Sequence, residues 1–135
     1  LMYSMYEMYF DGGAEPNPGK AGAGAVIYKD NTEIYCIAVF VGEKETNNTA
    51  EYTGLIKGLE LALNNNIDSL IVKGDSELII KQLNKEYKVK AENLKLLFNE
   101  AEILIKKFKN IEFKHVKRNL NKRADELSRI ARDDK

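Results

Sequence analysis

The stretch TAEYTGLIKGLELAL, residues 49–63, marks the change from a strand pattern to a helix pattern along this chain. Its apolar side chains recur at the spacing of one helix face, at Tyr52, Leu55, Ile56, Leu59, Ala62 and Leu63. Such a stripe predicts an amphipathic helix over residues 49–65. The residues before it favour strands and turns, and those after it alternate between the two patterns. The sequence therefore predicts an α/β fold.

Three strands are predicted before this helix. Residues 3–10 are rich in Tyr, Met and Phe, and Asp11-Gly12-Gly13 is expected to end that strand in a turn. Residues 14–24 hold both prolines and are expected to form a loop. The β-rich runs 24–28 and 33–41 are separated by only four residues, which predicts a hairpin. These short connections make the three strands antiparallel.

Strands and helices alternate after residue 65. The pattern predicts a buried strand at 69–73, a short helix at 77–84, a long helix at 94–108, a strand at 111–116 and a closing helix from 121 to about 132. Helices placed between the later strands require crossover connections. The expected architecture is therefore a mixed sheet with helices packed on it.

Composition excludes several classes of protein. The chain has 135 residues, 44% apolar and 31% charged, which is typical of one globular domain, here residues 1–135 with a core of about 5–132. The single cysteine, Cys36, permits no internal disulfide and no cysteine-based zinc site. No apolar run approaches the roughly 18 to 20 residues that span a bilayer, and residues 1–9 do not resemble a signal peptide. We expect a soluble, cytoplasmic protein.

Charge is balanced overall but unevenly distributed. The chain carries 21 basic and 21 acidic residues, which argues against a simple polycationic coat for nucleic acid. Residues 106–123 nevertheless hold eight basic residues against one acid, Glu112. This stretch is either an ordinary solvated surface or a patch that faces phosphates, and composition alone leaves both open.

Four carboxylates stand at the boundaries of the predicted elements: Asp11, Glu51, Asp75 and Asp125. Each has a local explanation. Asp11 fits a turn, Glu51 fits a capping box begun by Asn48, Asp75 precedes a helix as part of an N-cap pair, and Asp125 opposes a helix dipole.

The four carboxylates have a joint explanation if the first and fourth strands are neighbours. Asp11 and Asp75 would then emerge side by side, and two helix N-termini would bring Glu51 and Asp125 alongside. Clustered carboxylates repel unless cations hold them ionised. A set of oxygen ligands suits Mg²⁺, with Mn²⁺ as a substitute, rather than zinc. Two such ions about 4 Å apart are a known device for in-line phosphoryl displacement.

The segments that carry these carboxylates resemble the four motifs of type 1 ribonuclease H. They are Tyr9-Phe10-Asp11-Gly12-Gly13 (followed by Asn17-Pro18-Gly19 and Gly22-Ala23-Gly24), Thr46-Asn47-Asn48-Thr49-Ala50-Glu51-Tyr52, Gly74-Asp75-Ser76, and Asn121-Lys122-Arg123-Ala124-Asp125-Glu126-Leu127. Their order and their spacings of 40, 24 and 50 residues match that family. The resemblance covers about Met5 to Arg132. It implies a five-stranded mixed sheet, three antiparallel strands followed by crossovers, with helices on both faces.

The resemblance also implies an activity. Members of this family hydrolyse the RNA strand of an RNA–DNA hybrid and leave 5′-phosphate and 3′-hydroxyl ends. By this likeness Asp11 would bridge two Mg²⁺ ions, Asp125 would share the ion that activates water, and Glu51 and Asp75 would complete the other. We expect the hybrid to be the partner, with no membrane and no obligate protein partner, and we expect a monomer.

Substrate contacts are implied in the same way. Asn17, Lys44 and Thr46 fall where the family holds a phosphate of the DNA strand, with Lys44 in place of an arginine. Asn47, Asn48 and Glu77 fall where it touches the minor groove and the 2′-hydroxyls. The 2′-hydroxyl is the group that distinguishes RNA from DNA. For the asparagine and threonine side chains, helix capping is the alternative, and both roles are compatible.

The sequence departs from well-studied bacterial members in two places. The basic helix and loop that they carry before the long helix is missing, because residues 87–93 lead almost directly into it. The loop before the last helix is short, and the only histidine, His115, falls in the fifth strand run. His115 is either an auxiliary catalytic group or a packed, hydrogen-bonded residue. Arg118 is expected to approach the scissile phosphate.

Two other functions remain to be weighed. A catalytically silent nucleic-acid-binding module would gain nothing from four bare carboxylates. A different nuclease or integrase of the same superfamily is disfavoured by the Asn47-Asn48 pair and by the lack of additional DNA-binding segments.

Overall fold

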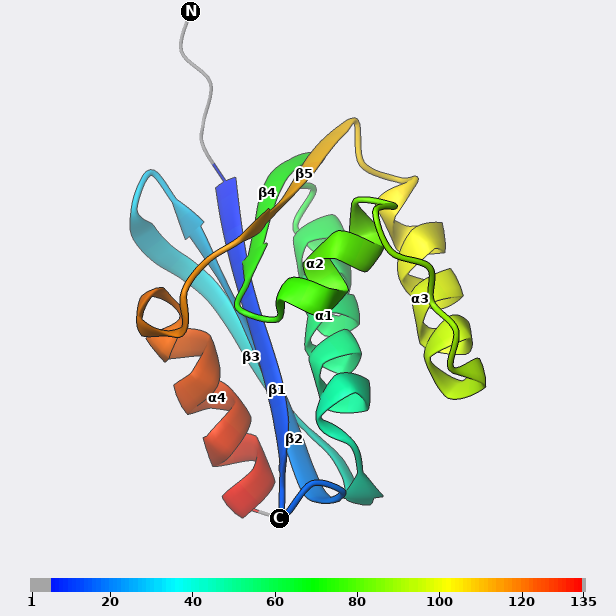
Figure 1. Ribbon diagram of the computed structural model, residues 1–135. Coiled ribbons are helices and arrows are strands. Elements are labelled where there is room, and N and C mark those ends of the chain that lie inside the picture. The colour runs from blue at the N-terminus through cyan, green and yellow to red at the C-terminus, as the bar shows by residue number, and fades with distance from the viewer. Residues whose placement is uncertain (1–5, 135) are drawn as a thin grey trace, which may run out of the picture.

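The structure is a computed structural model that describes residues 6–134 (Figure 1). The elements in chain order are β1 (Tyr6–Glu15), β2 (Gly19–Lys29), β3 (Thr32–Glu45), α1 (Asn47–Asn64), β4 (Ser69–Gly74), α2 (Glu77–Leu83), α3 (Glu92–Ile105), β5 (Asn110–His115), a 3₁₀ turn at Arg118–Leu120 and α4 (Lys122–Asp133). This order confirms the predicted succession of strands and helices. The part of the first predicted strand before residue 6 lies outside the described residues.

The five strands form one mixed sheet in the order β3-β2-β1-β4-β5. β1 and β2 are antiparallel, as are β2 and β3, and β4 runs parallel to both β1 and β5. The tight β2–β3 connection uses Asp30 and Asn31, which both have positive φ, as a two-residue hairpin turn requires. The predicted hairpin and the predicted crossovers are therefore confirmed.

Helices cover both faces of this sheet (Figure 1). α4 packs on β1, β2 and β3, while α1 packs on β1 and β2 and also contacts α3. The larger core lies between the sheet and α1 to α3, and its fully buried side chains include Met8, Phe10, Ile27, Leu55 and Leu59. A smaller cluster of Val26, Ala124 and Leu127 lies beneath α4.

Two predictions near the first strand are wrong. Asp11-Gly12-Gly13 does not end the strand, because β1 continues through Glu15 and stays paired with β2 along its length. The expected loop over residues 14–24 shrinks to residues 16–18, since Gly19 already begins β2. Local turn preference is overridden here by the ladder of hydrogen bonds between two long strands.

No helix within residues 6–134 is long and apolar enough to cross a membrane.

Candidate active site

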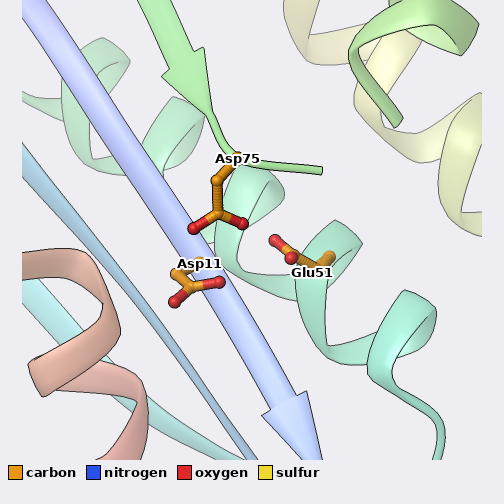
Figure 2. A group of neighbouring side chains, drawn as sticks. All are labelled: Asp11, Glu51 and Asp75. Atoms are coloured by element: carbon orange, nitrogen blue, oxygen red, sulfur yellow. The ribbon is translucent and has the colours of Figure 1, made fainter. Parts of the chain in front are cut away.

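Three carboxylates meet beside the sheet (Figure 2). Asp11 lies within β1, Glu51 lies in the first part of α1, and Asp75 follows the last residue of β4. One oxygen from each lies within 4.8 Å of the others. The predicted clustering of these three residues is therefore confirmed, although Asp11 lies in the middle of its strand rather than at its end.

The register of β1 and β4 brings Asp11 and Asp75 together. These strands are parallel neighbours, and Phe10 is paired with Gly74. The next residue after each of these is an aspartate, so that Asp11 within β1 and Asp75 just after β4 lie at the same level of the sheet. The sequence predicts that Asp11 and Asp75 lie side by side if the first and fourth strands are neighbours, and β1 and β4 are neighbours.

Glycines let two helices approach the strands that carry this cluster. A Cβ atom on Gly12 would lie 2.6 Å from the amide nitrogen of Glu51, and one on Gly54 would lie 2.5 Å from the carbonyl oxygen of Asp11. α1 therefore rests directly on β1. On the other face, a Cβ atom on Gly24 would lie 2.5 Å from the Cβ of Leu127, so that α4 rests directly on β2.

The Glu51 side chain takes no part in capping its own helix. The N-cap of α1 is Thr46, whose side chain accepts a hydrogen bond from the Thr49 amide. The capping box predicted from Asn48 is therefore wrong. Glu51 is only 8% exposed, and its Oε1 is buried without a hydrogen-bond partner among the described residues. A buried carboxylate oxygen with no partner is costly, so this atom is available to a ligand.

Asp125 stands at the edge of the cluster. It lies in the first turn of α4, as predicted, it lines the same cleft as Asp11 and Glu51, and its charge contributes to raising the pKa of Asp11. Its Oδ2 forms an ion pair of 2.7 Å with Nη2 of Arg129, one helical turn further along. Asp125 is therefore shared between the cluster and an arginine.

The cluster resists ionisation of its buried members. Burial, followed by the nearby charge of Asp75, raises the pKa of Asp11 from 3.8 to about 7, although the Gly12 amide, which donates to its Oδ1 at 2.9 Å, works in the opposite direction. Burial and the charges of Asp11 and Asp75 also raise the pKa of Glu51 well above its usual range, with Arg118 opposing. A cation placed among these oxygens would reverse this effect.

Two predicted substrate residues are tied to each other. Oδ1 of Asn17, in the β1–β2 turn, accepts a hydrogen bond of 3.0 Å from the backbone amide of Asn47. Oδ1 of Asn47 accepts a hydrogen bond of 2.8 Å from the Ala14 amide. The turn and the start of α1 are therefore held together, and Asn47 is exposed, with its NH₂ group available as a donor. Lys44 is exposed near the end of β3, two residues before Thr46.

The remaining predicted residues lie around the cluster. Glu77 is exposed in the first turn of α2, directly after the N-cap Ser76. Arg118 lines a cleft of about 430 Å³ together with Asp11, Glu51 and Asp125. His115 is exposed at the end of β5, paired with Gly74 in the sheet, so the alternative of a packed, hydrogen-bonded side chain is wrong in its packing. Its catalytic role stays a prediction.

The sequence missed one residue of this site. Asn121, which precedes α4, is 1% exposed and donates from Nδ2 to Oδ2 of Asp75 at 3.2 Å. Its position four residues before Asp125 was part of the fourth motif, but no local pattern indicated which element its side chain would meet. The cleft also holds Arg129 and Arg132 of α4, which helical spacing places on the same face as Asp125.

Sequence comparison relates the chain to known proteins. A family profile described as "Reverse transcriptase-like" matches residues 9–131. The "Bifunctional protein Rv2228c" of Mycobacterium tuberculosis is 37% identical over 124 residues, covering 91% of this chain and 34% of that protein. The "Ribonuclease HI" of Halobacterium salinarum is 36% identical over 126 residues, covering 93% of this chain and 63% of that protein. The chain thus spans about a third of the mycobacterial relative and under two thirds of the halobacterial one.

Solved structures agree with this result. The crystal structure of RNase H1 from Halobacterium salinarum has a TM-score of 0.92 at 34% identity and covers 97% of this chain and 99% of that chain. LC11-RNase H1, crystallised in complex with an RNA/DNA hybrid, has a TM-score of 0.89 at 38% identity and covers 96% of this chain and 97% of that chain. The likeness therefore extends over nearly the whole chain in both fold and sequence.

Proposed function

This chain belongs to the type 1 ribonuclease H family, and on that premise we propose that it hydrolyses the RNA strand of RNA–DNA hybrids, leaving 5′-phosphate and 3′-hydroxyl ends. The observation that carries the proposal is the cluster of Asp11, Glu51 and Asp75, with Asp125 at its edge. A nearby family member has been crystallised with such a hybrid, which supports the substrate class.

The residues of the cluster fit divalent cations. Every candidate ligand atom is a carboxylate oxygen, which suits a hard ion such as Mg²⁺ or Mn²⁺. The buried Oε1 of Glu51 lacks a partner that such an ion would provide. We assign Asp11, Glu51, Asp75 and Asp125 as the ligands. When bound, paired ions supply activation of water and stabilisation of the leaving oxygen.

The protein itself contributes orientation and charge. Asp11 and Glu51 hold their protons to unusually high pH without a cation, so cation binding and proton release are coupled at this site. The rigid contacts of α1 and α4 with the sheet fix the carboxylates before any ligand arrives. Arg118 lines the same cleft, where its guanidinium would bind a phosphate of the RNA strand.

The start of α1 is the proposed reader of RNA. Asn47 presents its NH₂ group because its carbonyl oxygen is engaged by Ala14. Asn48 is the next residue of the same helix turn and is half-buried. These amides would contact the minor groove, which is wide and shallow in A-form helices and displays the 2′-hydroxyls. Asn17, Lys44 and Thr46, on the neighbouring turn and strand end, would hold a phosphate of the DNA strand.

A cleavage assay tests this function. The protein is incubated with a labelled RNA–DNA hybrid, double-stranded RNA, single-stranded RNA or double-stranded DNA of one sequence, with Mg²⁺ or with EDTA. We expect Mg²⁺-dependent cuts in the RNA strand of the hybrid, with 5′-phosphate ends. Asp11→Asn should abolish them, whereas Asp68→Asn, which removes an exposed carboxylate outside the cluster, should not. Absence of cleavage by the folded protein with either Mg²⁺ or Mn²⁺ would contradict the proposal.

A further inference from the structure

Asn121 is a polar residue buried at the junction of three elements. It is 1% exposed, and it is the only polar side chain among the largest fully buried ones apart from Tyr52 in the described part of the chain. Its Nδ2 donates two hydrogen bonds, one to the carbonyl oxygen of Phe10 at 2.9 Å and one to Oδ2 of Asp75 at 3.2 Å. Phe10 directly precedes Asp11, so one amide group joins the strands that carry two carboxylates of the cluster.

The backbone of Asn121 extends this connection to the last helix. Its carbonyl oxygen accepts a hydrogen bond of 3.1 Å from the Asp125 amide, and its own amide donates to the carbonyl oxygen of Arg118 at 3.0 Å. Asn121 therefore contacts Asp75 directly. It also bonds to Phe10, the residue before Asp11, and to the backbone of Asp125, one helical turn further along. No other residue in the described range makes hydrogen bonds of this kind to all three segments.

Packing alone does not account for an asparagine at this position. Its Oδ1 is buried with no hydrogen-bond partner among residues 6–134, a condition that an apolar side chain of similar volume would avoid. The two donated bonds are what distinguishes asparagine here. An aspartate would have the same size but would place a fifth carboxylate against Asp75 and would lack the donor.

We propose that Asn121 is a positioning residue that fixes the Asp75 carboxylate for binding a divalent cation. Holding Oδ2 stops rotation of the carboxylate and so sets the position of Oδ1. The bond to Phe10 fixes the same amide against β1, and Asp75 is thereby held at a constant distance from Asp11. This inference rests on the proposed function, because it assumes that the cluster binds a cation. Partners of this kind around metal-binding carboxylates commonly tune affinity.

The test compares Asn121→Ala with Gln82→Ala. Gln82 is also a buried amide, 4% exposed, but it accepts its hydrogen bond from Tyr52 in the main core, away from Asp75. Thermal unfolding is measured without substrate over a range of Mg²⁺ concentrations, and cleavage is measured over the same range. We expect both variants to lower Tm without Mg²⁺. Only Asn121→Ala should raise the Mg²⁺ concentration for half-maximal stabilisation, by about tenfold or more.

A double variant shows whether Asn121 acts through Asp75. When Asn121→Ala is added to Asp75→Asn, Tm should fall further. The Mg²⁺ concentration for half-maximal stabilisation should remain that of the Asp75→Asn single variant. If Asn121→Ala does not fold, Asn121→Ser is measured in the same way. A variant at 121 that loses stability but keeps the wild-type Mg²⁺ response overturns the inference alone. A wild-type protein that neither responds to Mg²⁺ nor cleaves the hybrid overturns the proposed function instead.

Discussion

Gly12 of β1 packs so closely on the first turns of α1 that a Cβ atom there would lie 2.6 Å from the amide nitrogen of Glu51. The contact is with backbone, which cannot rotate away as a side chain can. We expect Gly12→Ala to displace α1 and to lower the free energy of unfolding by about 1–3 kcal/mol or more, as overpacking does. Because α1 carries Glu51, cleavage should fall even under conditions where the variant is fully folded. Chemical denaturation and cleavage assays below the unfolding transition measure the two effects.

Gly13 provides the matched control for this substitution. It is the next residue of the same strand, but the nearest atom to its Cβ position is Oδ1 of Asn47 at 3.8 Å, an ordinary contact. Neither glycine has positive φ, so an alanine meets no backbone strain at either position. Gly13→Ala should therefore change the free energy of unfolding by no more than about 0.5 kcal/mol. Equal effects at the two positions would contradict the close-contact explanation.

Asp11→Asn should abolish cleavage and stabilise the protein in the absence of divalent cations. The substitution removes a proposed cation ligand, and it also removes a carboxylate that burial and Asp75 disfavour in its ionised form. We expect Tm in EDTA at pH 8 to rise by several degrees, which corresponds to roughly 1 kcal/mol or more for a domain of this size. Calorimetry on both proteins measures this, and retention of Mg²⁺-dependent cleavage would refute the assignment of Asp11.

The stability of the cation-free protein should fall as pH rises from about 4 to about 7. The pKa of Asp11 is raised from 3.8 to about 7 in the folded state, and that of Glu51 is raised as well, so the folded protein binds more protons than the unfolded chain in this window. Stability then decreases with increasing pH. The difference between wild type and Asp11→Asn in urea unfolding isolates the Asp11 contribution. Saturating Mg²⁺ should reduce this difference in the free energy of unfolding between the two proteins. A difference that does not change with pH would contradict the prediction.

Asn48→Ala is the cleaner probe of RNA recognition. Because Thr46 is the N-cap of α1, Asn48 does not cap the helix, and its replacement should leave Tm nearly unchanged. Cleavage of the hybrid should fall several-fold, as expected for the loss of about 1 kcal/mol of hydrogen bonding. Asn47→Ala should lower both, since it also leaves the Ala14 amide without its acceptor. Initial rates at substrate concentrations below KM, with Tm measured in parallel, separate these cases. Unchanged cleavage by Asn48→Ala would place recognition elsewhere.

Binding of the hybrid should weaken steeply with salt and depend little on base sequence. The basic stretch 106–123 and Lys44 favour contacts with phosphates, whose strength depends on the release of counterions. Fluorescence anisotropy with the Asp11→Asn variant, which we expect to bind without cleaving, measures Kd between about 50 and 200 mM salt. We expect a decrease in affinity of at least tenfold over this range, and a flat dependence would show that phosphate contacts contribute little.

Local patterns predicted most of the fold but not its long-range geometry. The apolar stripe that includes Tyr52 and Leu55 predicted α1, and the short connection at Asp30 and Asn31 predicted the hairpin. Both patterns lie within a few residues of one another along the chain. Asp11 was expected in a turn because Asp-Gly-Gly is a turn sequence, and only pairing with β2 keeps it in a strand. Pairing of β1 with β4 could be stated only as a condition.

The candidate site shows the same division. The four carboxylates could be picked out because their types, order and spacing form a pattern along the chain. The contacts that hold them could not, since the bond between Asn121 and Asp75 joins residues 46 positions apart through a buried amide. Thr46 rather than Asn48 as the N-cap, and the ion pair of Arg129 with Asp125, likewise depend on backbone geometry that residue types do not specify.

The docking of α4 on β2 also bears on when the candidate site is completed while the chain is being synthesised. Gly24 is synthesised about 100 residues before the helix that rests on it and carries Asp125, residues 122–133. A chain still on the ribosome therefore already contains Asp11, Glu51 and Asp75 but lacks the fourth carboxylate. We expect the proposed nuclease activity to begin only after α4 has been synthesised and has docked on the sheet, in a single step rather than as a gradual gain.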